Sequence, residues 1–131
     1  MITIVVVAHV PLATALVACA QHVLGQMPDV IAIDILPNEC AIDCAPRLAQ
    51  QLSAVDQGEG VLVLTDLPGA TPSNIAVQAS HLAQTAGVPC CVLGGVNASM
   101  LLRAINYRQG SLEDVAASAL AGATHALLRV D

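Results

Sequence analysis

The sequence predicts an α/β fold: a three-layer αβα domain built around a mostly parallel sheet. Short apolar runs rich in Val, Ile and Leu alternate with longer stretches of helical spacing. Such short runs are typical of strands buried on both faces of a sheet, and their alternation with helices favours parallel pairing through right-handed crossovers. Since no repeat, linker or low-complexity segment divides the sequence, we expect residues 1–131 to form a single domain.

The first strand is expected over residues 2–8, because the run Ile-Thr-Ile-Val-Val-Val-Ala is continuous and β-branched. Pro11 suits the first turn of the helix that follows, since its φ is fixed and it has no N–H. That helix is expected to end at Leu24. Pro46 falls inside the second helix, which we expect to start late or to bend there. The remaining strands are expected over residues 30–36, 60–65 and 90–93, and the remaining helices over 39–52, 72–86, 96–107 and 111–121.

Three later junctions carry their own signals. Thr71 followed by Pro72 predicts an N-cap and the first turn of a helix. Gly122 is expected to end the last helix, because glycine readily adopts the left-handed conformation that closes helices. Residues 126–130 are apolar apart from Arg129 and form a candidate final short strand.

Composition excludes several classes of function. The net charge is −6, with four Arg and no Lys, and aromatic residues make up 1% of the chain. Nucleic-acid binding is not expected, because it needs clustered cations and stacking platforms. Hydrophobic residues make up 56% and charged residues 11%, which argues against disorder and indicates a buried interface. An acidic surface suits a partner with a basic face.

The five cysteines do not predict a disulfide framework, since their number is odd and their spacing irregular. Cys40 and Cys44 lack the further ligands that a metal site would need, so we expect free thiols in a reducing compartment. The N-terminal stretch has no basic segment and is interrupted by His9 and Pro11, which disfavours a signal peptide or a membrane span. We therefore expect a cytoplasmic protein without metal or cofactor.

Two strand ends carry the candidate chemistry. His9 ends the first strand and Asp66 follows the third, and a doubly wound sheet places these strands side by side with their carboxyl ends at one edge. A carboxylate bound to one ring nitrogen fixes the tautomer and makes the other nitrogen a better nucleophile. The loop 69–72 opens a helix whose free N–H groups suit an anion. Together these features favour phosphoryl transfer onto histidine.

Each of these features is often structural when it occurs alone: a histidine ending a strand, an aspartate in a turn, or a Pro-Gly loop. Only their meeting at one sheet edge makes the functional interpretation the better one. The other histidines lack such company. His22 and His81 fall within expected helices and His125 lies near the end of the sequence, so we do not expect them to do chemistry.

The residues at these positions resemble a known family, the EIIA domain of the mannose family of the bacterial phosphoenolpyruvate-dependent sugar phosphotransferase system. The resemblance spans essentially the whole sequence. It rests on Ala8-His9 with Leu12-Ala13, on Asp66 followed by Gly-Ala-Thr-Pro-Ser-Asn (69–74), and on Gly-Gly-Val-Asn-Ala-Ser-Met-Leu (94–101).

The resemblance implies that His9 accepts a phosphoryl group from the phosphohistidine of the carrier HPr and passes it to an EIIB partner. It also implies that Asp66 orients His9, and that Gly69, Ala70 and Thr71 hold the phosphate. The chain would serve a membrane-associated permease complex without inserting into the membrane itself.

A homodimer is also implied, in which residues 126–130 form an antiparallel edge strand that can be swapped between subunits. Two positions depart from the family pattern. The family commonly has Gly directly after the active histidine, where this sequence has Val10 followed by Pro11, and Ala70 stands where Gly is usual.

Other functions remain open at this stage. The same fold and site can serve as the phosphoryl donor of a phosphoenolpyruvate-dependent dihydroxyacetone kinase. They can also serve a regulatory protein that reports phosphorylation without a cognate permease. A third alternative is an α/β module that binds a small molecule and is never phosphorylated. Since no EIIB domain is fused within these residues, onward transfer is expected to need a separate protein.

Overall fold

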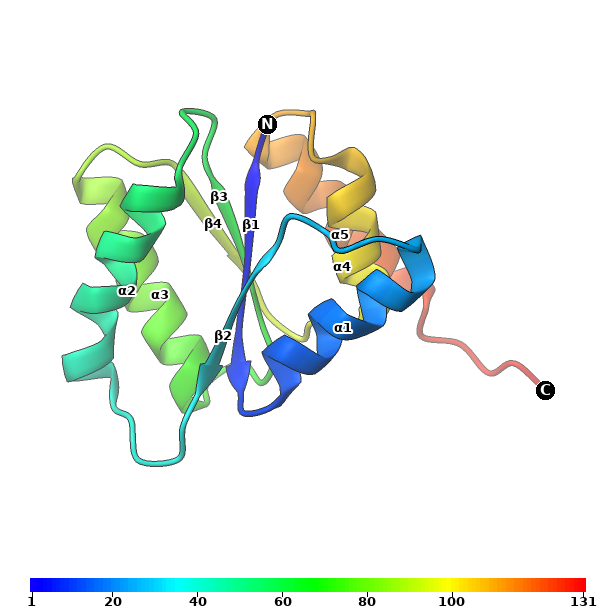
Figure 1. Cartoon of the computed structure of the whole chain (residues 1–131), viewed down its shortest axis with the longest axis horizontal. Coiled ribbons are helices and arrows are strands. Elements are labelled where there is room, and N and C mark those ends of the chain that lie inside the picture. Colours follow the sequence, from blue (N-terminus) through cyan, green and yellow to red (C-terminus); the bar gives the residue numbers. More distant parts are fainter.

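The computed structural model describes all residues from 1 to 131 and contains four strands and five helices (Figure 1). The strands are β1 (Thr3–His9), β2 (Ile31–Ile35), β3 (Val61–Thr65) and β4 (Cys90–Leu93). The helices are α1 (Leu12–Leu24), α2 (Ala41–Val55), α3 (Thr71–Thr85), α4 (Ala98–Tyr107) and α5 (Leu112–His125). All strands are parallel, in the order β2-β1-β3-β4. The predicted three-layer αβα fold is thus confirmed, with β1 and β3 as central neighbours.

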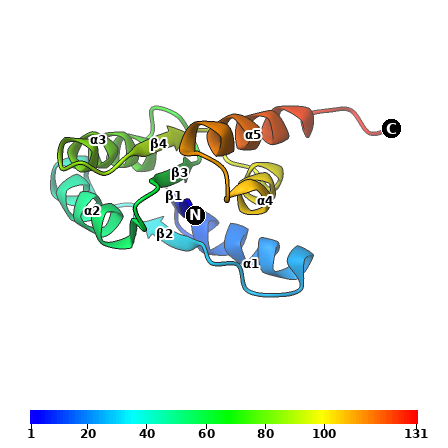
Figure 2. The ribbon, with the colours of Figure 1, turned by 90° about the horizontal axis from the view of Figure 1, so that it is seen from above.

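Helices cover both faces of the sheet, with α2 and α3 on one side and α1, α4 and α5 on the other (Figure 2). Successive side chains of a strand point to opposite faces. Ile4, Val6 and Ala8 of β1 accordingly pack toward α1, α4 and α5, while Val5 and Val7 pack toward α2 and α3. Because both faces are buried, the central strands need uninterrupted apolar sequence, which is the pattern that predicted them.

Gly122 does not end the last helix, so that prediction is wrong. Helix α5 continues through it to His125. A Cβ added at Gly122 would lie 2.9 Å from the Cβ of Arg103 on α4, which is closer than real Cβ contacts allow. The absence of a side chain therefore lets α4 and α5 approach each other closely, and close approach is the other common use of glycine.

The final strand expected over residues 126–130 is also absent. These residues leave α5 as irregular chain with no strand pairing and extend away from the body (Figure 1). Leu127, Leu128 and Val130 are 77%, 62% and 90% exposed. An apolar run becomes a strand only when a neighbouring strand satisfies its backbone groups, and within one chain no neighbour reaches it. The described sheet accordingly has no antiparallel edge strand.

Helix α2 starts at Ala41, two residues later than expected, and runs to Val55. Pro46 lies inside it without ending it. Helix α4 also starts two residues late, at Ala98, where the side chain of Asn97 accepts a hydrogen bond from the Met100 N–H at 2.9 Å. The Asn97 cap accounts for the late start of α4, whereas α2 begins after Cys40 without a side-chain cap.

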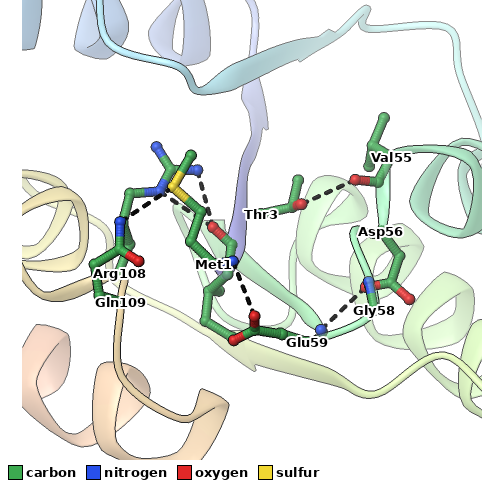
Figure 3. Close-up of polar contacts among 10 residues, drawn as sticks. Met1, Thr3, Val55, Asp56, Gly58, Glu59, Arg108 and Gln109 are labelled. Atoms are coloured by element: carbon green, nitrogen blue, oxygen red, sulfur yellow. Dashed lines mark hydrogen bonds and ion pairs between the residues drawn. The ribbon is translucent and has the colours of Figure 1, made fainter.

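The amino edge of the sheet is held by a buried arginine (Figure 3). Arg108 follows α4 and is 7% exposed. Its Nε and Nη2 donate to the carbonyl of Ile2 at 3.2 and 2.9 Å, and its Nη1 donates to the carbonyl of Asp29 at 2.8 Å. Burial lowers the pKa of this guanidinium, but arginine remains charged in proteins. One side chain thus ties the end of α4 to the start of β1 and to the segment before β2.

Replacing Arg108 by alanine is expected to lower the free energy of unfolding by about 2–3 kcal/mol, because two carbonyl groups lose their donors. Chemical denaturation measures this change. Arg129→Ala is the matched control, since the Arg129 side chain is 87% exposed, and it should alter stability by less than about 0.5 kcal/mol. An equal loss in both variants would contradict the role given to Arg108.

Candidate functional site

His9 and Asp66 meet at the carboxyl edge of the sheet. The His9 Nδ1 lies 2.6 Å from the Asp66 Oδ2. The same oxygen accepts the His9 backbone N–H at 2.9 Å, so one carboxylate oxygen holds both the ring and the main chain of the histidine. The sequence predicted this meeting, and the structure brings the two residues together.

The register of the central strands explains the meeting. Val7 of β1 is paired with Thr65 of β3. Asp66 is the next residue after Thr65, and His9 lies two residues after Val7, so both come at the same edge of the sheet. The loop before α4 then fixes the end of β3. Gly95 N–H donates to the Asp66 carbonyl at 2.7 Å, and Val96 N–H donates to the Thr65 carbonyl at 2.9 Å. The backbone that carries Asp66 is therefore tied to strand β1 on one side and to the α4 loop on the other.

The two side chains differ in burial and charge. Asp66 is 7% exposed, whereas the His9 side chain is 48% exposed. Burial by itself raises the pKa of Asp66, but hydrogen bonds from the backbone and ring of His9 and from the Leu67 N–H outweigh burial and lower this pKa below its usual value. Asp66 is therefore a carboxylate at neutral pH and can only accept hydrogen bonds.

This carboxylate determines which ring nitrogen of a neutral His9 carries the proton. The nitrogen facing Asp66 must be the donor, so the proton lies on Nδ1 and the lone pair lies on Nε2. No hydrogen bond within the chain engages Nε2. A half-exposed imidazole with a free, basic nitrogen can act as a nucleophile toward an electrophile that arrives from solvent.

The loop after Asp66 forms a tight turn. The Leu67 carbonyl accepts the Ala70 N–H at 3.0 Å, Pro68 follows Leu67, and Gly69 has a φ of +87°. Proline at the second position and a residue with positive φ at the third are typical of a type II turn. Glycine is needed at this third position, because other residues rarely adopt a positive φ.

Helix α3 begins with Thr71, and Ala70 is its N-cap. The prediction that Thr71 is the N-cap is wrong by one residue, because the extended backbone belongs to Ala70. Alanine has no side-chain acceptor, and the helix start has no side-chain cap. Pro72 has no N–H, and the backbone N–H groups of Thr71 and Ser73 have no acceptor. The start of α3 therefore presents unpaired donors, as anion sites do.

An open depression surrounds the histidine. His9, Leu12, Asp66, Leu67, Gly95 and Val96 line it. Gly69 and Ala70 lie in the adjoining turn and Thr71 begins α3, and none of the three lines this depression. Leu12 and Val96 belong to the motifs on which the family resemblance rests, whereas the sequence did not single out the third apolar wall, Leu67.

The remaining candidate residues lie elsewhere. His22, His81 and His125 are exposed on helices and form no ion pair with a carboxylate. All five cysteines are unpaired, and burial raises the pKa of Cys90 and Cys91. No group of three or more His, Cys, Asp or Glu side chains is placed to hold a metal ion. None of the helices has the length and apolar character needed to cross a membrane.

Val10 and Pro11 form the link that departs from the family pattern, and their peptide bond is cis. No residue other than glycine has a positive φ. The turn after His9 therefore does not use the left-handed conformation that only glycine adopts readily, and valine is compatible with the backbone there.

Comparison with known proteins places the chain in a family. A family model described as PTS system fructose IIA component matches residues 3–120. The mannose-specific EIIAB component of the phosphotransferase system of Escherichia coli K12 is 32% identical over 111 residues, which are 82% of this chain and 32% of that protein. The transcriptional regulatory protein LevR of Bacillus subtilis 168 is 31% identical over 98 residues, 72% of this chain and 10% of LevR. The chain thus spans about a tenth to a third of these relatives.

Solved structures show the same fold. Phosphotransferase system component EIIA from Streptococcus agalactiae has a TM-score of 0.84 at 25% identity, with 98% of this chain and 97% of that chain covered. The mannose/sorbose specific IIA subunit from Enterococcus faecalis has a TM-score of 0.85 at 22% identity, with 98% and 94% covered. The match to the family model and the identity to the mannose-specific relative agree with the resemblance seen in the sequence. The chain therefore belongs to the mannose family of EIIA components of the phosphotransferase system.

Proposed function

We propose that the protein is a cytoplasmic phosphocarrier in which His9 accepts a phosphoryl group from phospho-HPr and passes it to an EIIB partner. The observation that carries this proposal is the 2.6 Å contact between the His9 Nδ1 and the buried Asp66 carboxylate. This contact leaves Nε2 free and basic at a half-exposed position. EIIA components belong to a phosphotransferase relay, and this geometry suits a transient phosphohistidine.

The chemistry follows from the geometry. Nε2 attacks the phosphorus atom of the donor phosphohistidine. The new N–P bond forms as the donor's N–P bond breaks, and the donor imidazole takes back the electron pair of that bond. Positive charge develops on the His9 ring while its proton stays on Nδ1. Asp66 stabilises this charge across a short, partly buried hydrogen bond, where electrostatic interactions are stronger than in water. Transfer to EIIB is the same step in reverse with a different imidazole or thiolate as acceptor.

The start of α3 is the proposed cradle for the phosphoryl oxygens. Helices α1 to α4 all follow strand ends at the carboxyl edge, but at three of these starts a side-chain acceptor or an acidic residue is already present. The Asp34 carboxylate bonds to the first turn of α1, Asp43 lies in the first turn of α2, and Asn97 caps α4. Helix α3 has neither a side-chain cap nor an acidic residue in its first turn. We infer that Gly69, Ala70 and Thr71 hold the phosphate there.

An apolar rim surrounds His9 and suits carriers that dock briefly. We define the rim as Val10, Leu12, Leu36 and Leu67, which are 38% to 62% exposed. Val10, Leu36 and Leu67 lie in the loops that follow β1, β2 and β3, and Leu12 is the first residue of α1. Exposed apolar side chains around a polar centre are typical of protein–protein contact sites, and the net charge of −6 favours basic partners. We propose that HPr and EIIB occupy this rim in turn.

We further infer a homodimer in which residues 126–130 of each subunit pair with the sheet of the other. Three of these residues are apolar and more than 60% exposed, and they extend away from their own domain (Figure 1). A tail of this kind buries its apolar side chains only against a second chain.

A second candidate is a module whose phosphorylation state regulates a partner. The similarity to LevR, a transcriptional regulatory protein, favours it. The chemistry at His9 would be the same and only the recipient would differ. Mixing the phosphorylated protein with EIIB, or with the ADP-loaded subunit of a dihydroxyacetone kinase, decides between transfer and a purely regulatory role.

His9→Ala is expected to abolish labelling by radioactive phosphoenolpyruvate, enzyme I and HPr, because it removes the acceptor nitrogen. The label on the wild-type protein should be lost in acid and stable in base, as phosphohistidine is. His81→Ala, which removes an exposed histidine from α3, serves as the control and should be labelled at the wild-type rate. Labelling that survives in the His9→Ala protein would sink the proposal.

Asp66→Asn keeps the size of the side chain but removes its charge. The rate of His9 phosphorylation is expected to fall on the order of 10²-fold, in the range typical of a lost acid-base or orienting partner. Rapid-quench measurement with phospho-HPr gives this rate. Asp43→Asn removes a carboxylate from the start of α2 and should keep the rate within about threefold, since surface charges change such rates modestly. A wild-type rate in folded Asp66→Asn would remove Asp66 from the mechanism.

The lowered pKa of Asp66 also predicts a pH dependence of stability. The folded-state pKa lies below the unfolded value of about 3.9, so the carboxylate stabilises the fold above that pH and loses its contribution as the pH falls through the folded pKa. Chemical denaturation of the wild type and of Asp66→Asn should therefore give stabilities that converge between about pH 5 and pH 2. A constant difference across this range would contradict the assignment.

A further inference from the structure

The link between the candidate nucleophile and the next helix is very short. Strand β1 ends at His9 and α1 begins at Leu12, so two residues separate them. The Val10 N–H donates to the Ile35 carbonyl of β2 at 3.1 Å. Any shift in the start of α1 is therefore transmitted to His9 through two peptide units whose path is already restrained.

Helix α1 has no cap of its own, because Pro11 stands at the N-cap and offers no side-chain acceptor. Asp34 of β2 supplies the acceptor instead. Its Oδ1 accepts the backbone N–H of Thr14 at 3.3 Å, and its Oδ2 accepts the Thr14 hydroxyl in a short hydrogen bond. Thr14 is the third residue of α1, and the N–H at this position is the one that an N-cap side chain usually binds.

The alternation of β2 explains why Asp34 can reach α1. Ile33 and Ile35 pack with the core on the α2 and α3 side, so Asp34 between them points to the opposite face, where α1 lies (Figure 2). Asp34 is also in register with Ala8, the residue before His9. In Figure 1 the first turn of α1 lies beside the ends of β1 and β2. The carboxylate thus joins the helix to the strand next to the histidine.

We propose that Asp34 is a positioning residue for phosphoryl transfer. By holding Thr14 it fixes the start of α1, and through Val10 and Pro11 it fixes the direction in which the His9 ring presents Nε2. Leu12, the first residue of α1, lines the depression with His9. The contact between Asp34 and Thr14 therefore also fixes the position of Leu12 in that depression. This inference rests on the proposed role of His9 as phosphoryl acceptor. Asp34 itself touches no reacting atom and acts through the helix.

Three variants separate the parts of this contact. Asp34→Ala removes both acceptors, Thr14→Val removes only the hydroxyl donor, and Asp34→Asn removes the charge but keeps an acceptor for the Thr14 N–H. Glu113→Gln is the matched control, because Glu113 is exposed on α5 and its side chain makes no hydrogen bond. Circular dichroism first verifies that each variant is folded at the assay temperature.

The first measurement is the rate of His9 phosphorylation as a function of phospho-HPr concentration. We expect Asp34→Ala to lower kcat about tenfold and Thr14→Val about threefold, since small misplacements of a reacting group cost this much or more, while KM stays within about twofold. Asp34→Asn should recover at least half of the wild-type kcat, and Glu113→Gln should match the wild type. Wild-type kcat in folded Asp34→Ala, or an Asn variant as slow as the Ala variant, would overturn the proposal.

The second measurement needs no phosphoryl donor and reads the position of the ring directly. Nuclear magnetic resonance with ¹⁵N-labelled histidine detects the proton between the His9 Nδ1 and Asp66. In Asp34→Ala this proton should exchange faster with water, and the ring signals of His9 should shift, whereas those of His81 should not. If the wild type takes no phosphate from phospho-HPr, the proposed function fails, but this measurement still tests whether Asp34 positions the His9 ring. Unchanged His9 signals in folded Asp34→Ala would refute the positioning role.

Discussion

One carboxylate oxygen organises the carboxyl edge of the sheet. Asp66 Oδ2 binds both the backbone N–H and the ring of His9, so the orientation of the imidazole is coupled to the path of the main chain. This double contact requires β1 and β3 to be neighbours in the observed register. It also requires the Gly95 and Val96 N–H groups to hold the end of β3. The helices that cover the sheet keep those strands in place, and the chemistry of the site depends on that placement.

The two edges of the sheet differ in the groups that they carry. Buried Arg108 closes the amino edge with hydrogen bonds to backbone carbonyls. The carboxyl edge carries the exposed apolar rim, the uncapped start of α3 and the half-exposed ring of His9. Loops at the carboxyl edge can therefore differ in side chains without loosening the contacts that close the opposite edge. Parallel α/β sheets commonly gather their ligands at this edge, because every strand ends there.

Much of this arrangement can be predicted from the sequence. The short apolar runs identify four strands, and the doubly wound order makes β1 and β3 neighbours, so the meeting of His9 with Asp66 follows from topology. Side-chain contacts between elements that are distant in the sequence cannot be predicted in this way. Nothing local indicates that Asp34 binds Thr14, 20 residues away, or that Gly122 faces Arg103. Residues 126–130, which are mostly apolar, have the composition of a strand, but composition does not tell whether a partner strand is within reach.

The position of β1 in the sheet has a consequence for how the chain folds. This strand is the first of the four to be synthesised, yet it lies between β2 and β3. The carbonyl of Ile2 accepts hydrogen bonds from Arg108, which lies 106 residues further along the chain. Its neighbours in the sheet are therefore distant in sequence, and loop-closure entropy makes such pairings slow to form. During synthesis the most apolar segment of the domain leaves the ribosome well before the residues that bury it. A newly made chain must keep that strand from pairing with others until β3 and α4 have emerged.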